Sequence, residues 1–150
     1  MKEILLVEDD EHKSSKIKQI ITETIGIQNI TLHNNVCHTV RHLDKKTPDI
    51  LILDMSLPSH PPTAGEGSPL SMPSGGIEVV YELYYLKKVR IPTLILTQYT
   101  DVEIENEYYS MKEAEEKIRD NYGFSTVKVE MYDNDSSEWK DATREFLLSL

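Results

Sequence analysis

Residues 50–54 read ILILD, four apolar side chains in a row followed at once by a carboxylate. A short continuous apolar run is typical of a strand that is buried on both faces of a parallel sheet. Similar runs occupy residues 4–7 and 93–97, and weaker ones occupy residues 27–32 and 127–132. The sequence therefore predicts five strands. The last of them alternates apolar with charged residues and is expected at an edge of the sheet.

Amphipathic segments separate these runs. Apolar side chains recur at helical spacing in residues 11–24, 35–46, 77–88, 101–120 and 136–150. Strands that alternate with helices predict an α/β domain with a central five-stranded parallel sheet, and right-handed crossovers place helices on both of its faces. Ligands of such sheets bind outside the carboxyl ends of the strands. The residues that directly follow each strand are therefore the candidates for function.

Length and charge narrow the class of protein. The chain has 150 residues, which predicts one domain, and its 26 acidic against 16 basic residues give a formal net charge of -10. The acidic excess argues against binding to nucleic acid or to an anionic membrane. No apolar run approaches the roughly 18 residues of a membrane helix, and the first apolar run leads straight into acidic residues, unlike a signal peptide. A single cysteine, Cys37, excludes an internal disulfide. We therefore expect a cytoplasmic protein with no nucleic-acid or membrane partner.

Carboxylates and a hydroxyl stand at the ends of three predicted strands. Glu8, Asp9 and Asp10 follow the first strand, Asp54 follows the third, and Thr97 ends the fourth. If these ends are adjacent, the carboxylates repel one another, which either raises their pKa values or recruits a cation. Hard oxygen ligands with open positions suit Mg²⁺. A carboxylate beside Mg²⁺ can also accept a phosphoryl group. Taken alone, the acidic run after the first strand is equally consistent with the cap of the next helix.

The order and spacing of these motifs resemble the receiver domain of bacterial two-component response regulators, in an atypical single-domain form. The motifs are ILLVEDDE (residues 4–11), LILDMSLP (51–58) and PTLILT (92–97), and PSGGIE (73–78) resembles the family's turn into its third helix. The resemblance covers nearly the whole chain. It implies a flavodoxin-like topology and phosphoryl transfer to an aspartate, which is a signalling role rather than that of an enzyme.

The resemblance implies a role for each strand-end residue. Asp54 would be the phosphoacceptor, and Thr97 would be the switch hydroxyl that follows the phosphoryl group. Glu8 and Asp9 would bind Mg²⁺ together with Asp54 and the backbone carbonyl of Ser56. The implied partners are a histidine kinase or phosphotransfer protein and a downstream effector protein, reached by protein–protein contact because one receiver uses up the chain. No oligomeric state is predicted.

Three features depart from the family's pattern. The family places a lysine at the end of strand five, but here that strand ends VEMYDN (residues 129–134), and the nearest lysine, Lys128, stands near its start. The loop at about residues 57–76, which holds five of the seven prolines, is enlarged, and so is the helix-four region at about residues 98–124. We expect the loop to lie beside the acceptor and either to cover it or to bind a partner.

The missing lysine leaves two functions open. One is a stand-alone receiver that is phosphorylated on Asp54 and switches. The other is a degenerate receiver that acts as a constitutive protein-interaction module or as a phosphoryl sink. The missing lysine also predicts a site that is more negative than in related proteins and more dependent on Mg²⁺. An unrelated flavodoxin-like enzyme is the weakest hypothesis, because nothing in the sequence resembles a nucleophile–base pair.

Overall fold

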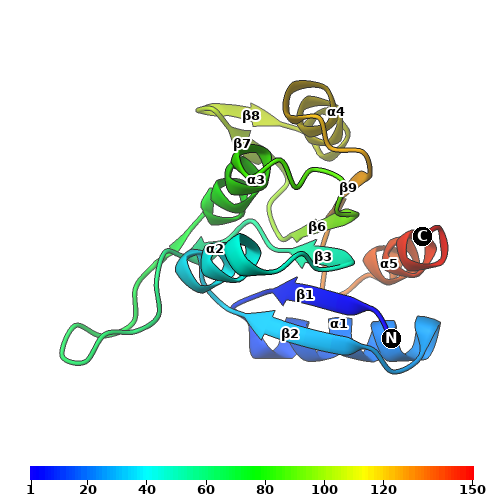
Figure 1. The fold of residues 1–150 in the computed structure, drawn as a ribbon, viewed down its shortest axis with the longest axis horizontal. Coiled ribbons are helices and arrows are strands. Elements are labelled where there is room, and N and C mark those ends of the chain that lie inside the picture. The colour runs from blue at the N-terminus through cyan, green and yellow to red at the C-terminus, as the bar shows by residue number, and fades with distance from the viewer.

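Five strands form a parallel sheet in the order β2-β1-β3-β6-β9 (Figure 1). They are β1 (Glu3–Val7), β2 (Asn29–His33), β3 (Ile50–Leu53), β6 (Thr93–Thr97) and β9 (Val127–Met131). The structure is a computed structural model that describes residues 1–150. Its central strands β3 and β6 are buried along their whole length, whereas β9 lies at an edge and exposes Lys128 and Met131. The predicted α/β fold class and the predicted edge strand are therefore confirmed.

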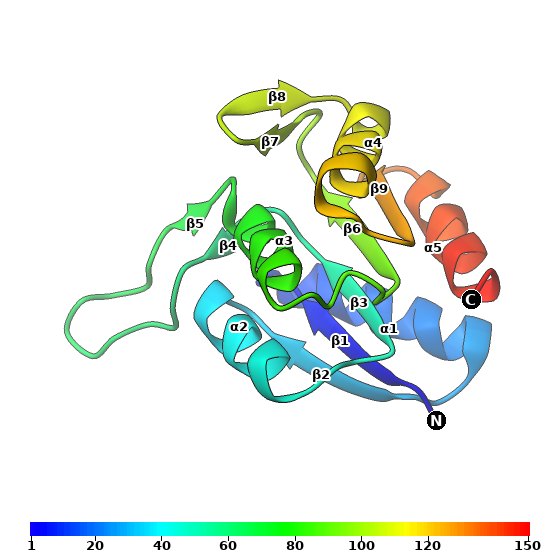
Figure 2. The ribbon, with the colours of Figure 1, turned by 45° about the horizontal axis from the view of Figure 1, so that its top comes forward.

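Helices cover both faces of the sheet (Figures 1 and 2). One face carries α1 (Glu11–Ile25) and α5 (Glu138–Leu148), and the other carries α2 (Val36–Lys45), α3 (Gly75–Tyr85) and α4 (Met111–Tyr122). Each face has its own apolar core, with Ile17, Ile21 and Trp139 in the first and Leu83 and Ile118 in the second. None of the helices combines the length and the apolar character needed to cross a membrane.

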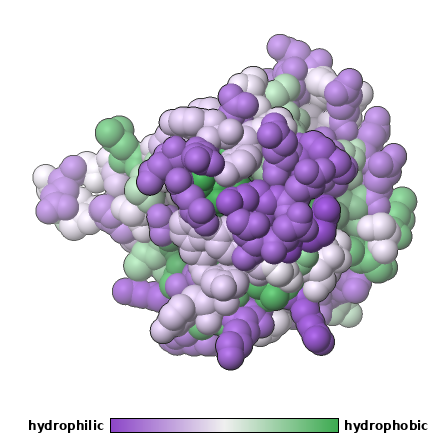
Figure 3. Space-filling model, turned by 90° about the horizontal axis from the view of Figure 1, so that it is seen from above, coloured by the Kyte–Doolittle hydropathy of each residue, from purple (hydrophilic) through white to green (hydrophobic).

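The helix predicted over residues 101–120 is wrong in its first half. Residues 102–109 form a hairpin of β7 (Val102–Ile104) and β8 (Glu107–Tyr109), and α4 begins only at Met111. The turn residues Glu105 and Asn106 both have positive φ, of 53° and 66°, which a helix does not allow. Ser110 then caps α4 through a capping box with Glu113. Figure 3 shows hydrophilic side chains gathered over this α4 side of the molecule.

The proline-rich loop forms a closed arm rather than an open coil. Its base is the two-residue ladder between β4 (Leu57–Pro58) and β5 (Ser71–Met72), and Thr63 bridges Gly67 near its tip. The arm, residues 59–70, projects away from the sheet (Figures 1 and 2). Only its base therefore lies next to the predicted site.

Candidate functional site

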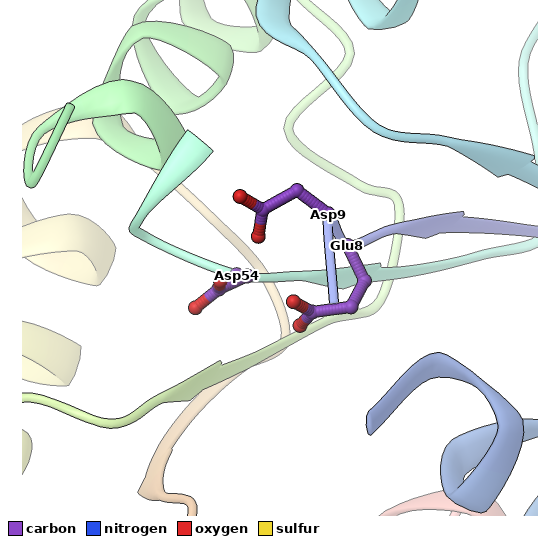
Figure 4. A group of neighbouring side chains, drawn as sticks. All are labelled: Glu8, Asp9 and Asp54. Atoms are coloured by element: carbon purple, nitrogen blue, oxygen red, sulfur yellow. The ribbon is translucent and has the colours of Figure 1, made fainter. Parts of the chain in front are cut away.

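Three carboxylates meet at the edge of the sheet where the strands end (Figure 4). Glu8 and Asp9 follow β1, Asp54 follows β3, and one oxygen from each lies within 4.8 Å of the others. Because β1 and β3 are neighbours with Val7 paired to Leu53, the chain leaves both strands at the same level. The structure thus brings together three of the residues predicted from the strand ends.

Asp54, the predicted phosphoacceptor, is held in a largely buried position. It is 6% exposed, and its backbone N–H donates to the carbonyl of Val7 at 3.0 Å. Burial raises the pKa of its carboxyl group above the ordinary value, against the opposing effects of the Lys13 ammonium and the Ser56 backbone N–H. Its Oδ1 is buried and accepts no hydrogen bond. Its only ion-pair partner is the Lys13 ammonium at 3.2 Å, so it keeps lone-pair capacity for a metal ion or for nucleophilic attack.

Two glycines let α3 pack directly on the backbone that carries the acceptor. A Cβ at Gly76 would lie 2.3 Å from the carbonyl oxygen of Asp54, and one at Gly75 would lie 2.6 Å from that of Leu57. The Gly76 N–H donates to the carbonyl of Met55 at 2.8 Å. Because only glycine permits such a close approach, the PSGGIE motif fixes the segment that follows β3.

The acidic run after β1 divides into two roles. Asp10 is the N-cap of α1, and its side chain accepts a hydrogen bond from the backbone N–H of Lys13 at 3.0 Å. Glu8 is buried and accepts from the backbone N–H of Asp10 at 3.1 Å. Asp9 is exposed, and its Oδ2 accepts a hydrogen bond from the Ser71 hydroxyl at the base of the arm, at 2.7 Å. The cap that the sequence left open is therefore Asp10, while Glu8 and Asp9 lie beside Asp54.

Thr97 and Ser56 lie on the segments that flank the carboxylates. Thr97 is fully buried at the end of β6, and its Oγ1 accepts a hydrogen bond from the Tyr99 N–H at 3.1 Å. The Tyr99 hydroxyl in turn donates to Oγ of Ser56 at 3.4 Å. The chain after β6 is thus linked to the chain after β3, next to the carboxylate cluster.

One residue of the site was not predicted from the sequence. Lys13, in the first turn of α1, is only 1% exposed, and its Nζ lies 2.7 Å from Oε2 of Glu8 and 3.2 Å from Oδ1 of Asp54. Nζ also donates to the carbonyl of Leu96 at 2.9 Å and lies 5.0 Å from the centre of the Tyr132 ring. A cation therefore lies inside the carboxylate cluster, although it comes from α1 and not from the end of strand five, where the sequence has no lysine.

A sequence signal for Lys13 did exist. The residue is four positions before Ile17 and falls on the apolar face of α1 together with Ile20 and Ile21. A lysine on a buried helix face is rare unless it is paired. Since α1 begins directly after Glu8 and Asp9, the partner was also close in the sequence.

Two of the three carboxyl groups of the site, those of Glu8 and Asp54, have raised pKa values. Burial raises the pKa of Glu8 to about 8, with the Lys13 ammonium opposing this rise and the Asp54 charge adding to it. Three carboxylates face one ammonium, and Oδ1 of Asp54 is left without a hydrogen bond. Hard carboxylate oxygens with an unused lone pair are the ligands that Mg²⁺ prefers. The residues present therefore fit this ion.

The fold has close counterparts among solved structures. The phosphorylated cyanobacterial phytochrome response regulator RcpA matches with a TM-score of 0.62 and 19% identity, over 99% of this chain and 94% of that one. The response regulator TrrA of Thermotoga maritima, solved in complex with Mg²⁺-BeF, matches with a TM-score of 0.58 and 19% identity, over 97% and 99%. At this identity the likeness shows the receiver fold alone. No protein-family model matches the chain.

A curated relative makes the assignment firm, and this chain belongs to the family of response-regulator receivers. The relative is the Detocs response regulatory protein DtcB of Vibrio alginolyticus, which is 46% identical over 148 residues. The alignment spans 97% of this chain and 99% of DtcB. The resemblance predicted from three strand-end motifs is therefore confirmed at the level of the family.

Proposed function

We propose that this chain is a stand-alone receiver that accepts a phosphoryl group on Asp54 and signals by contact with another protein. A carboxylate oxygen of Asp54 attacks the phosphorus of a phosphohistidine, the P–N bond breaks, and the departing imidazole takes a proton from water. The donor is a cytoplasmic histidine kinase or phosphotransfer protein. The observation that carries this proposal is the buried Oδ1 of Asp54, which accepts no hydrogen bond although it lies among charged groups.

The surrounding residues fit a supporting role. Glu8, Asp9 and Asp54, with the backbone carbonyl of Ser56, would hold Mg²⁺, which supplies positive charge against the roughly -1.5 to -2 charges of a phosphoryl group. Thr97 would donate its hydroxyl proton to a phosphoryl oxygen, since its Oγ1 is used only as an acceptor, from Tyr99. Because the Tyr99 N–H donates to Thr97, a movement of Thr97 would also displace the exposed segment that follows β6.

Phosphorylation can be tested without the natural kinase. Wild type is incubated with acetyl phosphate or phosphoramidate and Mg²⁺, and the product is separated on a phosphate-affinity gel. We expect a retarded band that is absent from Asp54→Asn and present in Asp120→Asn, an exposed aspartate on α4. Absence of the band from wild type with both donors, or its persistence in Asp54→Asn, would refute the proposal.

The second candidate function is a degenerate receiver that acts as a constitutive protein-interaction module or as a phosphoryl sink. The ion pairs of Lys13 favour it. Lys13 supplies a positive partner to Asp54 before any phosphoryl group arrives, so the site is already partly neutralised. Amide NMR spectra of ¹⁵N-labelled protein, with and without Mg²⁺ and beryllofluoride, separate the two functions. A switch shifts resonances beyond the site, including the segment from Gln98 to Tyr109. A phosphoryl sink or constitutive module confines the shifts to residues around Asp54.

A further inference from the structure

We propose that Lys13, on α1, is the cation that pairs with the phosphoryl group on Asp54, in place of a lysine at the end of β9. This inference rests on the proposed function, because it concerns the phosphorylated state of Asp54. Nothing in the resemblance to the family places a functional residue in the first turn of α1. The inference comes from four contacts of one buried ammonium group.

Lys13 reaches the ends of four strands. Its Nζ contacts Glu8 after β1, Asp54 after β3 and the carbonyl of Leu96 in β6, and it lies over the ring of Tyr132 after β9. An ammonium group has three N–H donors, and three oxygen atoms surround it at 2.7, 3.2 and 2.9 Å. Its longest contact is the one to Oδ1 of Asp54, the oxygen that accepts no hydrogen bond. Lys13 is thus placed to gain a better partner when phosphoryl oxygens appear there.

No other cation reaches this position. Lys13 is the only basic residue that forms an ion pair with Asp54, Glu8 or Asp9. Lys128, the lysine of β9, is paired in the sheet with Leu94, three residues before Thr97, and its Nζ contacts Glu115 and Glu130 instead. At about 3.3 Å per residue, its backbone lies roughly 10 Å short of the strand ends.

A tyrosine occupies the end of β9, which agrees with Lys13 taking the place of a lysine there. Tyr132 follows β9 and is buried, and its N–H donates to the carbonyl of Thr97 at 2.7 Å. Its ring lies against Trp139, with ring centres 4.7 Å apart, and faces Nζ of Lys13. The aromatic ring offers the ammonium a favourable cation–π surface. The place from which a strand-end lysine would approach is therefore occupied by a side chain that supports Lys13.

The proposal is tested with three variants in the acetyl phosphate reaction. Lys13→Met is expected to lower the rate of phosphorylation by about 100-fold. This is the size of effect that follows when one preorganised donor to a developing negative charge is removed from an active site. Lys18→Met, on the same helix and without an ion pair, is the matched control and is expected to react at the wild-type rate. The double variant Lys13→Met/Tyr132→Lys returns a lysine to the end of β9 and is expected to recover at least a tenth of the wild-type rate.

A purely structural role for Lys13 predicts a different pattern. If the ammonium only anchors α1 to the sheet, folded Lys13→Met reacts like wild type and Tyr132→Lys has no rescuing effect, which overturns the inference. In the absence of a phosphodonor, Lys13→Met is expected to bind Mg²⁺ at least as tightly as wild type by calorimetry, because a competing cation has left Glu8 and Asp54. Weaker Mg²⁺ binding by a folded variant would also contradict it.

A measurement on wild type covers the case in which Lys13→Met does not fold. The ¹⁵N resonance of the buried Lys13 ammonium, assigned by its loss in Lys13→Arg, is followed as Mg²⁺ and beryllofluoride are added. We expect it to shift, while an unchanged resonance in a protein whose Asp54 has bound beryllofluoride would overturn the inference. If wild type is neither phosphorylated nor bound by beryllofluoride, the proposed function fails instead, so the two failures are distinct.

Discussion

Lys13 and Glu115 are both nearly fully buried charges, on opposite faces of the sheet, yet their surroundings differ. Glu115, on α4, is 3% exposed and accepts a hydrogen bond from the Val129 N–H at 2.8 Å. The ammonium groups of Lys112 and Lys128 each lie 3.7 Å from its carboxylate and reach the solvent. One acid thus has a backbone donor and two cations. On the other face, one cation, Lys13, forms ion pairs with two acids, Glu8 and Asp54.

The difference lies in what remains unpaired. The negative charge of Glu115 is met completely, so nothing is left for a ligand, and the group ties α4 to the edge strand β9. Around Lys13 the carboxylates outnumber the ammonium, and one oxygen of Asp54 has no hydrogen bond. Burial of charge alone therefore does not mark a functional site. At the proposed site, the excess of carboxyl groups over ammonium groups is what a cation could bind.

The largest effect is expected from a substitution that displaces the backbone of Asp54, in the carboxylate cluster, and does not touch Glu115. Gly76→Ala places a Cβ 2.3 Å from the carbonyl oxygen of Asp54, so the backbone must move. We expect a loss of about 3 kcal/mol in the free energy of unfolding, the upper end for overpacking, together with slower phosphorylation of the folded fraction. Urea denaturation measures the loss. Ser74→Ala, whose side chain makes no cap hydrogen bond, is the control and should stay within experimental error of wild type.

Added Mg²⁺ should act on one cluster only. At 100 times its dissociation constant, a ligand that binds only the folded state raises the free energy of unfolding by about 2.7 kcal/mol. We expect this increase in wild type and in Glu115→Gln, and little of it in Asp9→Asn, which loses a proposed ligand. Denaturation with and without Mg²⁺, and again after EDTA, checks it. Equal stabilisation of all three proteins would mean that the carboxylate cluster is not the binding site.

Glu115 should affect stability without affecting chemistry. Glu115→Ala leaves the buried N–H of Val129 without its acceptor, and such an orphaned donor costs about 1–3 kcal/mol. The phosphorylation rate of the folded protein is expected to stay at the wild-type value. The exposed neighbour Glu116 supplies the control variant Glu116→Ala. A fall in the phosphorylation rate of Glu115→Ala would remove the distinction between the two clusters.

The pH dependence of stability should separate the clusters further. Without Mg²⁺, the raised pKa of Glu8, about 8 against an ordinary 4.5, means that the folded state holds a proton that the unfolded state has lost. The free energy of unfolding is therefore expected to fall as the pH rises from about 4.5 to about 8. Its slope between pH 6 and 8 should flatten in Glu8→Gln and stay unchanged in Glu115→Gln. The reverse result would place the raised pKa elsewhere.

The smallest effect concerns salt. Because the ammonium of Lys128 is solvent-exposed, Lys128→Met is expected to cost less than about 1 kcal/mol. The difference from wild type should shrink further in 1 M NaCl, where charges are screened within about 3 Å. The ion pair between Lys13 and Glu8 is shielded from solvent. The difference in the free energy of unfolding between wild type and a folded Lys13→Arg variant should therefore be nearly the same at both salt concentrations. Denaturation at two salt concentrations compares the two lysines.

The sequence predicted those parts of the fold that depend on local pattern. The apolar runs that became β1, β3 and β6 end at Glu8, Asp54 and Thr97, and parallel neighbours bring such ends to one edge. These positions follow from chain order and from the two-faced burial of the strands. The carboxylate cluster was therefore predictable before any side-chain position was known.

The rest depended on contacts across the sheet. Lys13 meets the carbonyl of Leu96, a residue 83 positions away, and no local pattern reports that contact. The β7–β8 hairpin was missed for another reason, because the apolar residues of 101–120 also fit a helical period. Ser110 and Glu113 form a capping box that marks the true start of α4, and this signal outweighs periodicity.

The arm has a practical consequence for work on this protein. Its two ends are held together by the β4–β5 ladder, and residues 59–70 project away from the carboxylates. For a loop whose ends are already joined, each doubling of length costs only about 0.6 kcal/mol of closure entropy. A fluorophore, an affinity tag or a short inserted peptide between Gly65 and Gly67 should therefore leave the sheet intact. The arm is a handle by which the receiver can be labelled while Ser71 stays on Asp9.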